Sequence, residues 1–329
     1  MIVPSDNSVG SSNLPSDRMS LVTKIARMYH ESGMRQPEIA ERLHLSQSRV
    51  SRFLKEAVTL GVVRTIVVPP PGVYTELEES IRDRFDLIDV VVVDSLGTDE
   101  PSIVSSLGVA GAAYLETTLM PSDRVGISSW SATLLAVVDA MNPRTVRAAE
   151  EVVQVIGGLG NPNVQVQATR LVDRLARVTG ATPRFFPAPG IVGSKAARDA
   201  LMDDSYIRLL TEDWKTLTVA IVGIGSVQPS PMLKDSGNAV SAEDTESLRR
   251  AGAVGDICLR FFDGKGDPLD IELGQRVVGI SIADLKAIPR KVGVAGGERK
   301  YEAIRGAVLG GWVDVLITDL HTARRLADS

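Results

Sequence analysis

The chain has few of the residue types on which metal and redox chemistry depend. Its 329 residues include one cysteine, Cys258, and three histidines, at positions 30, 44 and 321. A lone cysteine excludes an internal disulfide and is compatible with the cytoplasm. The histidines have no metal-ligand spacing between them, so we expect neither a metal nor a cofactor. Cys258 lies in the apolar run 253–262, which predicts a buried structural thiol rather than a nucleophile.

Long apolar runs and aromatic residues are also scarce. No stretch reaches the roughly 18 uninterrupted apolar residues of a transmembrane helix, so no membrane span is expected. Residues 1–17 are rich in Ser, Asn and Asp and have neither a basic start nor an apolar segment. This composition predicts a disordered tail rather than a signal peptide, and hence a cytoplasmic protein. Aromatics make up 4% of the chain against 44% hydrophobic residues, so the core should consist mainly of Val, Ile, Leu and Ala.

Charge is distributed unevenly along the chain. The net charge is −5, which is unusual for a DNA-binding protein. Residues 18–66, however, hold nine Lys and Arg against four Asp and Glu, a local charge of +5, and the remainder carries −10. A small basic head on a larger acidic body fits a regulator that touches DNA through one end only.

The segment 35–55, RQPEIAERLHLSQSRVSRFLK, has the layout of a DNA-reading helix-turn-helix. Ile39 and Leu43 are four residues apart and share one helix face, and Val50 and Phe53 repeat this pattern on a second helix. Ser46 is placed to cap the second helix by accepting a hydrogen bond from a backbone amide near residue 49. The alternative is an ordinary helical hairpin with a solvated polar face. The turn often has Gly where this chain has His44, which tolerates a positive φ less well than Gly, so some strain is expected.

The outward face of the second helix carries residue types that read base edges and hold phosphates. To these we add one polar residue near the start of the segment and one basic residue in the run after the second helix. The predicted DNA-binding residues are Gln36, Gln47, Ser48, Arg49, Ser51, Arg52, Lys55 and Arg64.

The flanking segments complete the predicted domain organisation. A helix is expected over 19–31, and the β-type run 62–68 resembles the wing of a winged helix-turn-helix, with Arg64 available to a phosphate. A proline cluster at 69–72 marks a boundary. The acidic amphipathic helix 74–85 is either a connector or a packing surface between subunits. We therefore predict a tail (1–17), a DNA-binding domain (18–68), a linker with a connecting helix (69–88) and an effector domain (89–329).

From residue 89 onward, strand-like and helical segments alternate. Continuous runs such as Val90 to Val93 indicate strands buried on both faces, and the alternation indicates a parallel, doubly wound α/β sheet. The predicted strands are 89–93, 124–128, 152–156, 217–222, 254–262, 291–295 and 313–317. The predicted helices are 102–119, 131–141, 164–179, 195–213, 243–250, 297–309 and 320–327.

Glycine-rich and polar loops follow four of these strands. They lie at 126–133, 156–160, 223–226 and 295–297, and the last opens a helix that carries Lys300. Ligands of such sheets bind outside the carboxyl ends of the strands, and glycine lets a ligand approach the backbone. One such loop is often only a turn, but four in one sheet predict a small-molecule pocket that includes Gly223 and Gly225.

Several motifs together resemble a known family. They are QPEIAERLHLSQSRVSRFL, SSWSATL, GGLG, PAPG at 187–190, GD at 255–256, FFD at 261–263 and VAGGERKYEAIRGAVLGGWVDVLITD at 294–319. From about residue 19 to its C-terminus the chain resembles the SorC/DeoR-type sugar-binding transcriptional regulators. The resemblance implies a winged helix-turn-helix followed by a sensor domain folded like sugar-phosphate isomerases. It also implies binding to operator DNA, a sugar or sugar-phosphate effector, and assembly into dimers or tetramers.

The resemblance also implies roles for individual residues. Asp256 would accept hydrogen bonds from sugar hydroxyls, and Gly296, Gly297 and Lys300 would hold a phosphate or a terminal oxygen. The remaining residues implied to line the sugar site are Ser128, Ser129, Thr133, Gly157, Gly158 and Gln167.

Two departures from the family pattern bear on the ligand. The chain has Ser131 and Ala132 where the family often has Gly then Arg, and Ile156 where some phosphosugar sensors have a basic residue. Both changes remove positive charge near the expected ligand and favour a weakly anionic or uncharged sugar or polyol. Three basic residues stay available as phosphate partners, which leaves the question open: Arg170, Lys195 and Lys300.

Two other functions are consistent with parts of the sequence. A sugar-phosphate isomerase or deaminase would share the expected sensor fold but would need a positioned acid or base. Asp256, Asp263 and Asp319 are candidates, but no histidine lies in the four glycine loops, and the helix-turn-helix would stay unexplained. A regulator with a degenerate, non-binding sensor is the other alternative.

Overall fold

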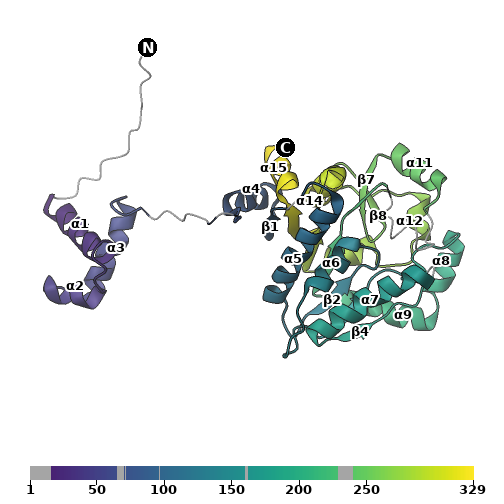
Figure 1. The fold of residues 1–329 in the computed structure, drawn as a ribbon, viewed down its shortest axis with the longest axis horizontal. Helices are drawn as coiled ribbons and strands as arrows, with labels where there is room; N and C mark the ends of the chain where they lie inside the picture. The colour runs from purple at the N-terminus through teal and green to yellow at the C-terminus, as the bar shows by residue number, and fades with distance from the viewer. Residues whose placement is uncertain (1–15, 65–69, 71, 96, 160–161, 229–239) are drawn as a thin grey trace, which may run out of the picture. The chain divides into compact units, whose positions relative to one another are not determined.

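The structure is a computed structural model that describes residues 16–64, 70, 72–95, 97–159, 162–228 and 240–329, with the backbone alone for Ser16 and residues 162–168. The chain divides into two compact units, residues 1–68 and residues 69–329 (Figure 1). Among the described residues, no helix is both long and apolar enough to cross a membrane.

The N-terminal unit consists of three helices whose apolar faces meet. The sequence predicted all three, the first over 19–31 and the other two on either side of the turn at 43–46. Ile25, Ile39 and Val50, one from each helix, are fully buried in the shared core. The helices are α1 (Ser16–His30), α2 (Gln36–Arg42) and α3 (Gln47–Thr59).

The turn between α2 and α3 closes α2 with two backbone hydrogen bonds. The amide of Leu45 donates to the carbonyl of Ala40 at 2.8 Å, and the amide of His44 donates to the carbonyl of Glu41 at 3.2 Å. This pair of bonds defines a Schellman motif, in which the residue after the helix end takes the left-handed conformation. His44 occupies that position with φ of 54°, so the strain predicted from the sequence is confirmed.

Only part of the predicted wing lies within the described residues. Val62, Val63 and Arg64 are described, and none of them is in a strand. Val63 packs against the helical core, and its amide donates to the carbonyl of Ala57 at 3.0 Å. Residues 65–68 lie outside the described residues, so the wing stays a prediction.

A sheet of seven parallel strands forms the centre of the second unit, in the order β1-β10-β9-β5-β2-β3-β4. Successive side chains of β1 point to opposite faces: Val90 and Val92 enter one core, and Val91 and Val93 pack against the other. The strands are β1 (Asp89–Val93), β2 (Arg124–Ile127), β3 (Glu151–Gln154), β4 (Thr182–Arg184), β5 (Val219–Gly223), β9 (Arg290–Val294) and β10 (Val315–Asp319).

Helices cover both faces of this sheet, which confirms the doubly wound architecture predicted from the alternating pattern (Figure 1). One core contains buried side chains of α5, α6 and α7, and the other contains those of α4, α13, α14 and α15. These helices are α4 (Thr75–Phe85), α5 (Glu100–Thr118), α6 (Ala132–Ala140), α7 (Pro162–Thr179), α13 (Ile282–Ala287), α14 (Tyr301–Leu309) and α15 (Leu320–Asp328).

The order of the strands reverses between β2 and β5. From β2 the chain proceeds outward to β3 and β4, whereas from β5 it proceeds in the opposite direction to β9 and β10. The connections that follow β2 and β5 therefore leave the sheet on opposite sides. A crevice opens at the carboxyl ends of strands at such a reversal.

The apolar run 254–262 was predicted as one strand, and this prediction is wrong. It forms two antiparallel strands, β7 (Ala253–Ile257) and β8 (Arg260–Asp263), which join β6 (Gly225–Ser226) in a separate sheet. Cys258 and Leu259 turn the chain, because both have positive φ, 53° and 59°. Two such residues in succession make a type I′ hairpin turn, for which Asn and Gly are the usual signals.

The other differences lie at helix ends and in short elements. The helix predicted over 195–213 is two helices, because the Asp204 side chain accepts hydrogen bonds from the amides of residues 206 and 207 and starts a new one. The helix predicted over 297–309 begins as a 3-10 turn before α14. The elements concerned, together with those not predicted, are α8 (Lys195–Met202), α9 (Ser205–Glu212), η1 (Asp213–Thr216), α12 (Glu272–Arg276) and η2 (Glu298–Lys300). Helix α11 (Ala242–Arg250) agrees with the helix predicted over 243–250. Strands β4 and β6 and helix α13 were also not predicted.

Helix α4, which follows the proline cluster, is fixed to the edge of the sheet. Ile81 is fully buried, and the Glu78 carboxylate accepts a hydrogen bond from the amide of Val92 in β1 at 2.9 Å. The Tyr74 hydroxyl donates to the carboxylate of Asp94, just beyond β1, at 3.2 Å. The acidic helix predicted over 74–85 therefore packs on the sensor unit, and its glutamate covers an edge amide of β1.

Candidate functional site

Helix α3 presents the polar residues predicted to read DNA on its exposed side. The Ser46 hydroxyl accepts a hydrogen bond from the amide of Arg49 at 3.3 Å, which confirms the predicted cap. Six of the eight predicted residues are exposed, and Ser51 and Gln36 are half-buried. The exposed ones on α3 are Gln47, Ser48, Arg49, Arg52 and Lys55. Arg64, beyond the end of α3, is exposed as well.

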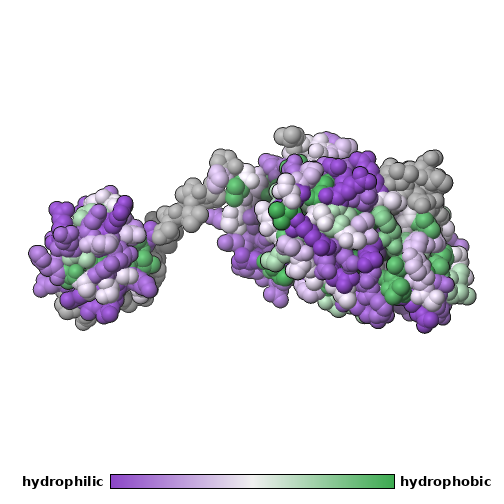
Figure 2. Space-filling model, turned by 90° about the horizontal axis from the view of Figure 1, so that it is seen from below, coloured by the Kyte–Doolittle hydropathy of each residue, from purple (hydrophilic) through white to green (hydrophobic). Residues whose placement is uncertain are grey.

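The basic side chains on this surface have no acidic partner within the described residues. Arg49, Arg52 and Lys55 form no ion pair there, and the one acidic residue of α3, Glu56, is bound by Arg18 of α1 at 2.9 Å. The Arg49 guanidinium lies 5.8 Å from the centre of the Phe53 ring. The face of the N-terminal unit seen in Figure 2 is mostly hydrophilic. Unpaired guanidinium and ammonium groups on such a surface are suited to phosphates and base edges.

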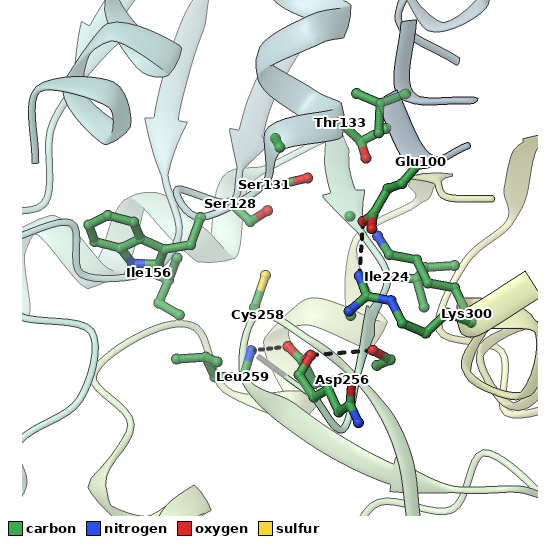
Figure 3. Close-up of a pocket in the computed structure, with 18 of the residues that line it drawn as sticks. Glu100, Ser128, Ser131, Thr133, Ile156, Ile224, Asp256, Cys258, Leu259 and Lys300 are labelled. Atoms are coloured by element: carbon green, nitrogen blue, oxygen red, sulfur yellow. Dashed lines mark hydrogen bonds and ion pairs between the residues drawn. The ribbon is translucent and has the colours of Figure 1, made fainter. Parts of the chain in front are cut away.

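A cavity of about 380 Å³ lies at the carboxyl ends of β2 and β5, where the strand order reverses (Figure 3). Small-molecule sites have volumes of about 300–1,000 Å³. The cavity is bounded by the first turn of α5, the β2–α6 loop, the segment after β5, the β7–β8 hairpin and η2. Six residues predicted for effector binding line it: Ser128, Thr133, Gly223, Gly225, Asp256 and Lys300.

The other predicted effector residues lie behind the cavity wall. The buried Ser129 hydroxyl donates to the carbonyl of Ile156 at 3.1 Å. The carbonyl of Gly157 accepts the indole N–H of Trp130 at 2.9 Å, and Gly158 is buried. The side chain of Gln167 lies outside the described residues. These residues, as far as they are described, shape the wall rather than line it.

Gly296 and Gly297 form the turn that leads to Lys300. The amide of Gly297 donates to the carboxylate of Asp319 at 2.7 Å, and its φ is 93°, where a side chain would be strained. A Cβ on Gly296 would lie 2.4 Å from the same carboxylate. Neither glycine lines the cavity. Their contribution is to fix the backbone position of the segment that carries Lys300.

Several lining residues were not predicted from the sequence. Three of them, Glu100, Pro101 and Val104, come from the first turns of α5, which follows the carboxyl end of β1. The rule that ligands bind beyond strand ends would have pointed to this segment as well. The others are Gln228, Cys258 and Leu259, whereas Trp130, Ser131, Ala132, Ile156, Ile224 and Ser226 lie in the predicted glycine loops and Arg299 lies between the predicted Gly297 and Lys300. For Cys258 and Leu259 no sequence signal was available, because the hairpin turn was not recognised.

Asp256 is the carboxylate best placed to accept hydrogen bonds from a ligand. One of its oxygens accepts from the amide of Leu259 at 2.9 Å, which also stabilises the strained turn. A Cβ on Gly225, its partner across the strand pair, would lie 2.1 Å from the other oxygen, so only glycine fits at that position. Burial raises the pKa of Asp256 to about 6, which leaves it mostly ionised at neutral pH.

The cations near the cavity differ in how they are paired. Arg299 binds Glu100 at 2.9 Å across the cavity wall. Burial lowers the pKa of Lys300, opposed by the neighbouring carboxylate of Glu100. The amide of Lys300 donates to the carbonyl of Gly297 at 2.9 Å, but its ammonium group has no hydrogen-bond or ion-pair partner among the described residues. Arg170 pairs with Asp139 at 2.9 Å and Lys195 pairs with Asp199, and neither lines the cavity.

The described residues include no group of three or more His, Cys, Asp and Glu side chains arranged to hold a metal ion. The polar groups that line the cavity include hydroxyls, one carboxamide, two carboxylates and two cations. This set is suited to hydrogen bonding with a hydroxylated organic ligand.

Comparison with known proteins identifies the family. Residues 70–327 match the family described as "Putative sugar-binding domain". The chain is 32% identical over 312 residues to a deoxyribonucleoside regulator from Bacillus subtilis (strain 168), with 95% of this chain and 98% of that protein covered. It is 29% identical over 315 residues to the sorbitol operon regulator of Klebsiella pneumoniae, with 94% and 98% covered.

Solved structures of related regulators indicate the same family. The full-length sorbitol operon regulator SorC from Klebsiella pneumoniae matches with a TM-score of 0.69 at 27% identity, covering 95% of this chain and all of that one. The sugar-binding domain of the transcriptional regulator DeoR from Pseudomonas syringae pv. tomato matches with a TM-score of 0.61 at 38% identity, covering 78% and 99%. These relatives are named as regulators rather than as enzymes. The chain therefore belongs to the SorC/DeoR family of sugar-binding transcriptional regulators.

Proposed function

We propose that this protein is a transcriptional regulator whose α3 binds operator DNA and whose cavity binds a sugar, polyol or phosphosugar effector. The observation that carries the proposal is the combination, in one chain, of a capped helix with unpaired basic side chains and a polar-lined cavity at a strand reversal. The names of the deoxyribonucleoside and sorbitol operon regulators support an effector from carbohydrate metabolism. Effector and DNA are coupled only if the effector binds two states of the protein with different affinity.

On the DNA side, Arg49 and Arg52 contribute most to the interface. Both are exposed on the first two turns of α3, where side chains reach base edges in the major groove. Lys55 and Arg64 neutralise phosphates, which adds affinity without sequence preference. The remaining proposed contacts are Gln36, Gln47, Ser48 and Ser51.

On the effector side, Asp256 accepts hydrogen bonds from ligand hydroxyls through the oxygen that does not hold the turn. Ser128 and Thr133, on the opposite rim of the cavity, donate or accept a further bond. Lys300 donates to a ligand oxygen, and this role is supported because its ammonium group has no partner among the described residues. Gly223 and Gly225 keep the cavity open next to the backbone.

The protein binds DNA as a symmetric dimer or tetramer. A single head with a charge near +5 offers too few contacts for tight operator binding at physiological salt. Two heads double the contacts and match a palindromic operator. Sedimentation at micromolar concentration should give a dimer or larger species, and a monomer with full operator affinity would contradict this.

Ligand binding proceeds without turnover. Isomerase chemistry needs a positioned acid or base, and the lining of the cavity includes no histidine. Of the three candidate aspartates only Asp256 lines it, and Asp319 is instead the capping residue of α15. Incubation with pentose and hexose phosphates should therefore leave the sugars unchanged, and formation of an isomerised or deaminated product would overturn this point.

The proposed function is tested by selecting operators from a random double-stranded DNA library with the full-length protein. The affinity of the selected DNA is then measured by fluorescence anisotropy with and without a panel of sugars, polyols and sugar phosphates. We expect at least one compound both to raise the melting temperature, by mass action, and to change the operator Kd. Enrichment of no sequence would contradict the regulator, and tight DNA binding that no compound alters would favour a degenerate sensor.

A further inference from the structure

The cavity has two chemically different sides. In Figure 3, Ile156, Cys258 and Leu259 lie on one side, and Glu100 and Lys300 lie on the other. The first side is supplied by the end of β3 and the β7–β8 turn, and the second by α5 and η2. A ligand that fills the cavity therefore contacts an apolar wall and a charged wall at the same time.

The apolar wall carries no formal charge. Trp130, Ile156 and Leu259 belong to one hydrophobic cluster, and Ile156 and Leu259 are 1% and 4% exposed. Burial raises the pKa of the Cys258 thiol to about 12, so it is neutral at physiological pH. The wall thus offers an indole ring, two aliphatic side chains and an uncharged thiol.

Hydrogen-bonding groups of this wall are already engaged within the protein. The indole N–H of Trp130 donates to the carbonyl of Gly157 at 2.9 Å. The carbonyl of Ile156 accepts from the Ser129 hydroxyl at 3.1 Å and from the Gln154 carboxamide at 3.0 Å. What the wall presents to a ligand is consequently carbon and sulfur surface.

The charged wall is close to neutral overall. Arg299 is paired with Glu100, and the Asp256 carboxylate is close enough to Lys300 to interact with it electrostatically. A phosphate ester brings about −1.5 to −2 charges at pH 7. A single unpaired ammonium group, with a carboxylate nearby, compensates such a group incompletely once it leaves water.

We propose that the effector is an uncharged sugar or polyol that bears an apolar substituent, such as a deoxy position, an alkyl group or an aromatic aglycone. The apolar part lies on the wall of Trp130, Ile156 and Leu259, while hydroxyls bind Asp256 and Lys300. The inference rests on the proposed function, since it names the class of ligand for the same cavity.

The test uses matched ligand sets with the full-length wild-type protein. Each set contains a parent sugar, its phosphate ester, its methyl glycoside and its phenyl glycoside, built on D-ribose and on D-glucose, with L-fucose and L-rhamnose as deoxy sugars. Kd is measured by calorimetry. In at least one set the apolar member should bind more tightly than both the parent and the phosphate, by about four-fold for each buried methylene-sized group.

Tryptophan fluorescence adds a measurement that does not depend on ranking affinities. The chain has three tryptophans, and Trp214 and Trp312 are buried at 3% and 0% exposure, whereas Trp130 is half-buried and lines the cavity. A ligand seated on the apolar wall should protect Trp130 from acrylamide quenching. A ligand that binds without changing the quenching lies elsewhere.

Two variants separate the walls. Ile156→Thr keeps the β-branch but places a hydroxyl in the apolar wall, and it should reduce the preference for the apolar member over its parent by about four-fold. Lys300→Met, the matched control on the charged wall, should leave that preference unchanged. If Ile156→Thr does not fold, the inference is tested by the order of ligand affinities in the wild type and by the quenching of Trp130.

The outcomes distinguish this inference from the proposed function. A phosphate ester that binds most tightly, or a parent sugar that equals its apolar derivatives, overturns the inference and leaves the sugar-sensing regulator in place. If no member of any set binds, the proposed function itself is contradicted for these sugars, and the inference falls with it.

Discussion

The two units use positive charge in opposite ways. On α3 the cations Arg49, Arg52 and Lys55 are exposed and have no acidic partner among the described residues, whereas in the cavity Arg299 is paired and Lys300 is half-buried. Exposed, unpaired cations attract a polyanion over a distance and release its counterions. A nearly neutral cavity recognises its ligand by hydrogen bonds and shape. The contrast indicates that the protein's interactions with DNA and with effector respond to different physical variables.

Salt concentration should separate the two interactions most strongly. Each phosphate contact contributes a slope of about −0.9 to the dependence of log K on log salt, so a dimer with six or more contacts loses roughly a thousand-fold in operator affinity from about 50 to about 200 mM salt. Effector affinity should change by less than about two-fold, because the cavity carries almost no net charge. Anisotropy and calorimetry over the same salt series measure both. Equal slopes of log K against log salt for operator and effector binding would contradict the difference between the two units.

The next largest effect should come from Arg49→Ala. Loss of a base contact costs roughly 1–3 kcal/mol of discrimination, so the affinity for the selected operator should fall about 5- to 150-fold, while the affinity for scrambled DNA falls little. Arg64→Ala is the matched control and should weaken both by similar factors. An unchanged ratio of specific to nonspecific affinity in Arg49→Ala would place sequence readout elsewhere.

Asp256→Asn should affect only the cavity. The substitution keeps the shape but removes the charge that strengthens hydrogen bonds by roughly 1 kcal/mol. Effector affinity should fall about five- to ten-fold, with operator affinity in the absence of effector unchanged. Full effector response in this variant would show that the carboxylate does not contact the ligand.

The raised pKa of Asp256 predicts opposite pH trends for ligand binding and for stability. Effector affinity should fall as the pH drops below about 6, because protonation removes the acceptor that ligand hydroxyls use. In the ligand-free protein the raised pKa means that protonation of Asp256 stabilises the folded state. This stabilisation is complete below pH 3.8 and is lost as the pH rises through about 6. Calorimetry and thermal melts between pH 5 and 7 should show both trends in the wild type and neither in Asp256→Asn.

The smallest effect concerns the turn of the N-terminal unit. His44→Gly relieves a left-handed residue and should stabilise that unit by about 0.5–1 kcal/mol, after allowing for the greater freedom of glycine in the unfolded chain. Ser46→Ala, which removes the cap of α3, should destabilise it by about 1 kcal/mol. Chemical denaturation followed by circular dichroism measures both, and destabilisation by His44→Gly would mean that the imidazole itself contributes contacts.

Local features were predictable from the sequence, and features that depend on strand order were not. The Ser46 cap, the strain at His44 and the strand at 89–93 each depend on neighbouring residues, and all three are confirmed. Glu100 follows the carboxyl end of β1, so the strand-end rule points to its segment, but the contact of α5 with the loop after β2 depends on strand order. Cys258 and Leu259 adopt a turn that their residue types disfavour, since Asp256 and the strand pairing stabilise it. Gly157 and Gly296 lie beside the cavity and shape its wall without lining it. The spacing of the motifs does not distinguish such residues from those that contact a ligand.

The attachment of α4 to β1 has a mechanical consequence. The hydrogen bond from Tyr74 to Asp94 ties the first residue before α4 to the start of the connection that ends, six residues later, at Glu100 in the cavity wall. A ligand that moved Glu100 would therefore act close, along the chain, to the residue that precedes α4, since only six positions separate Glu100 from Asp94.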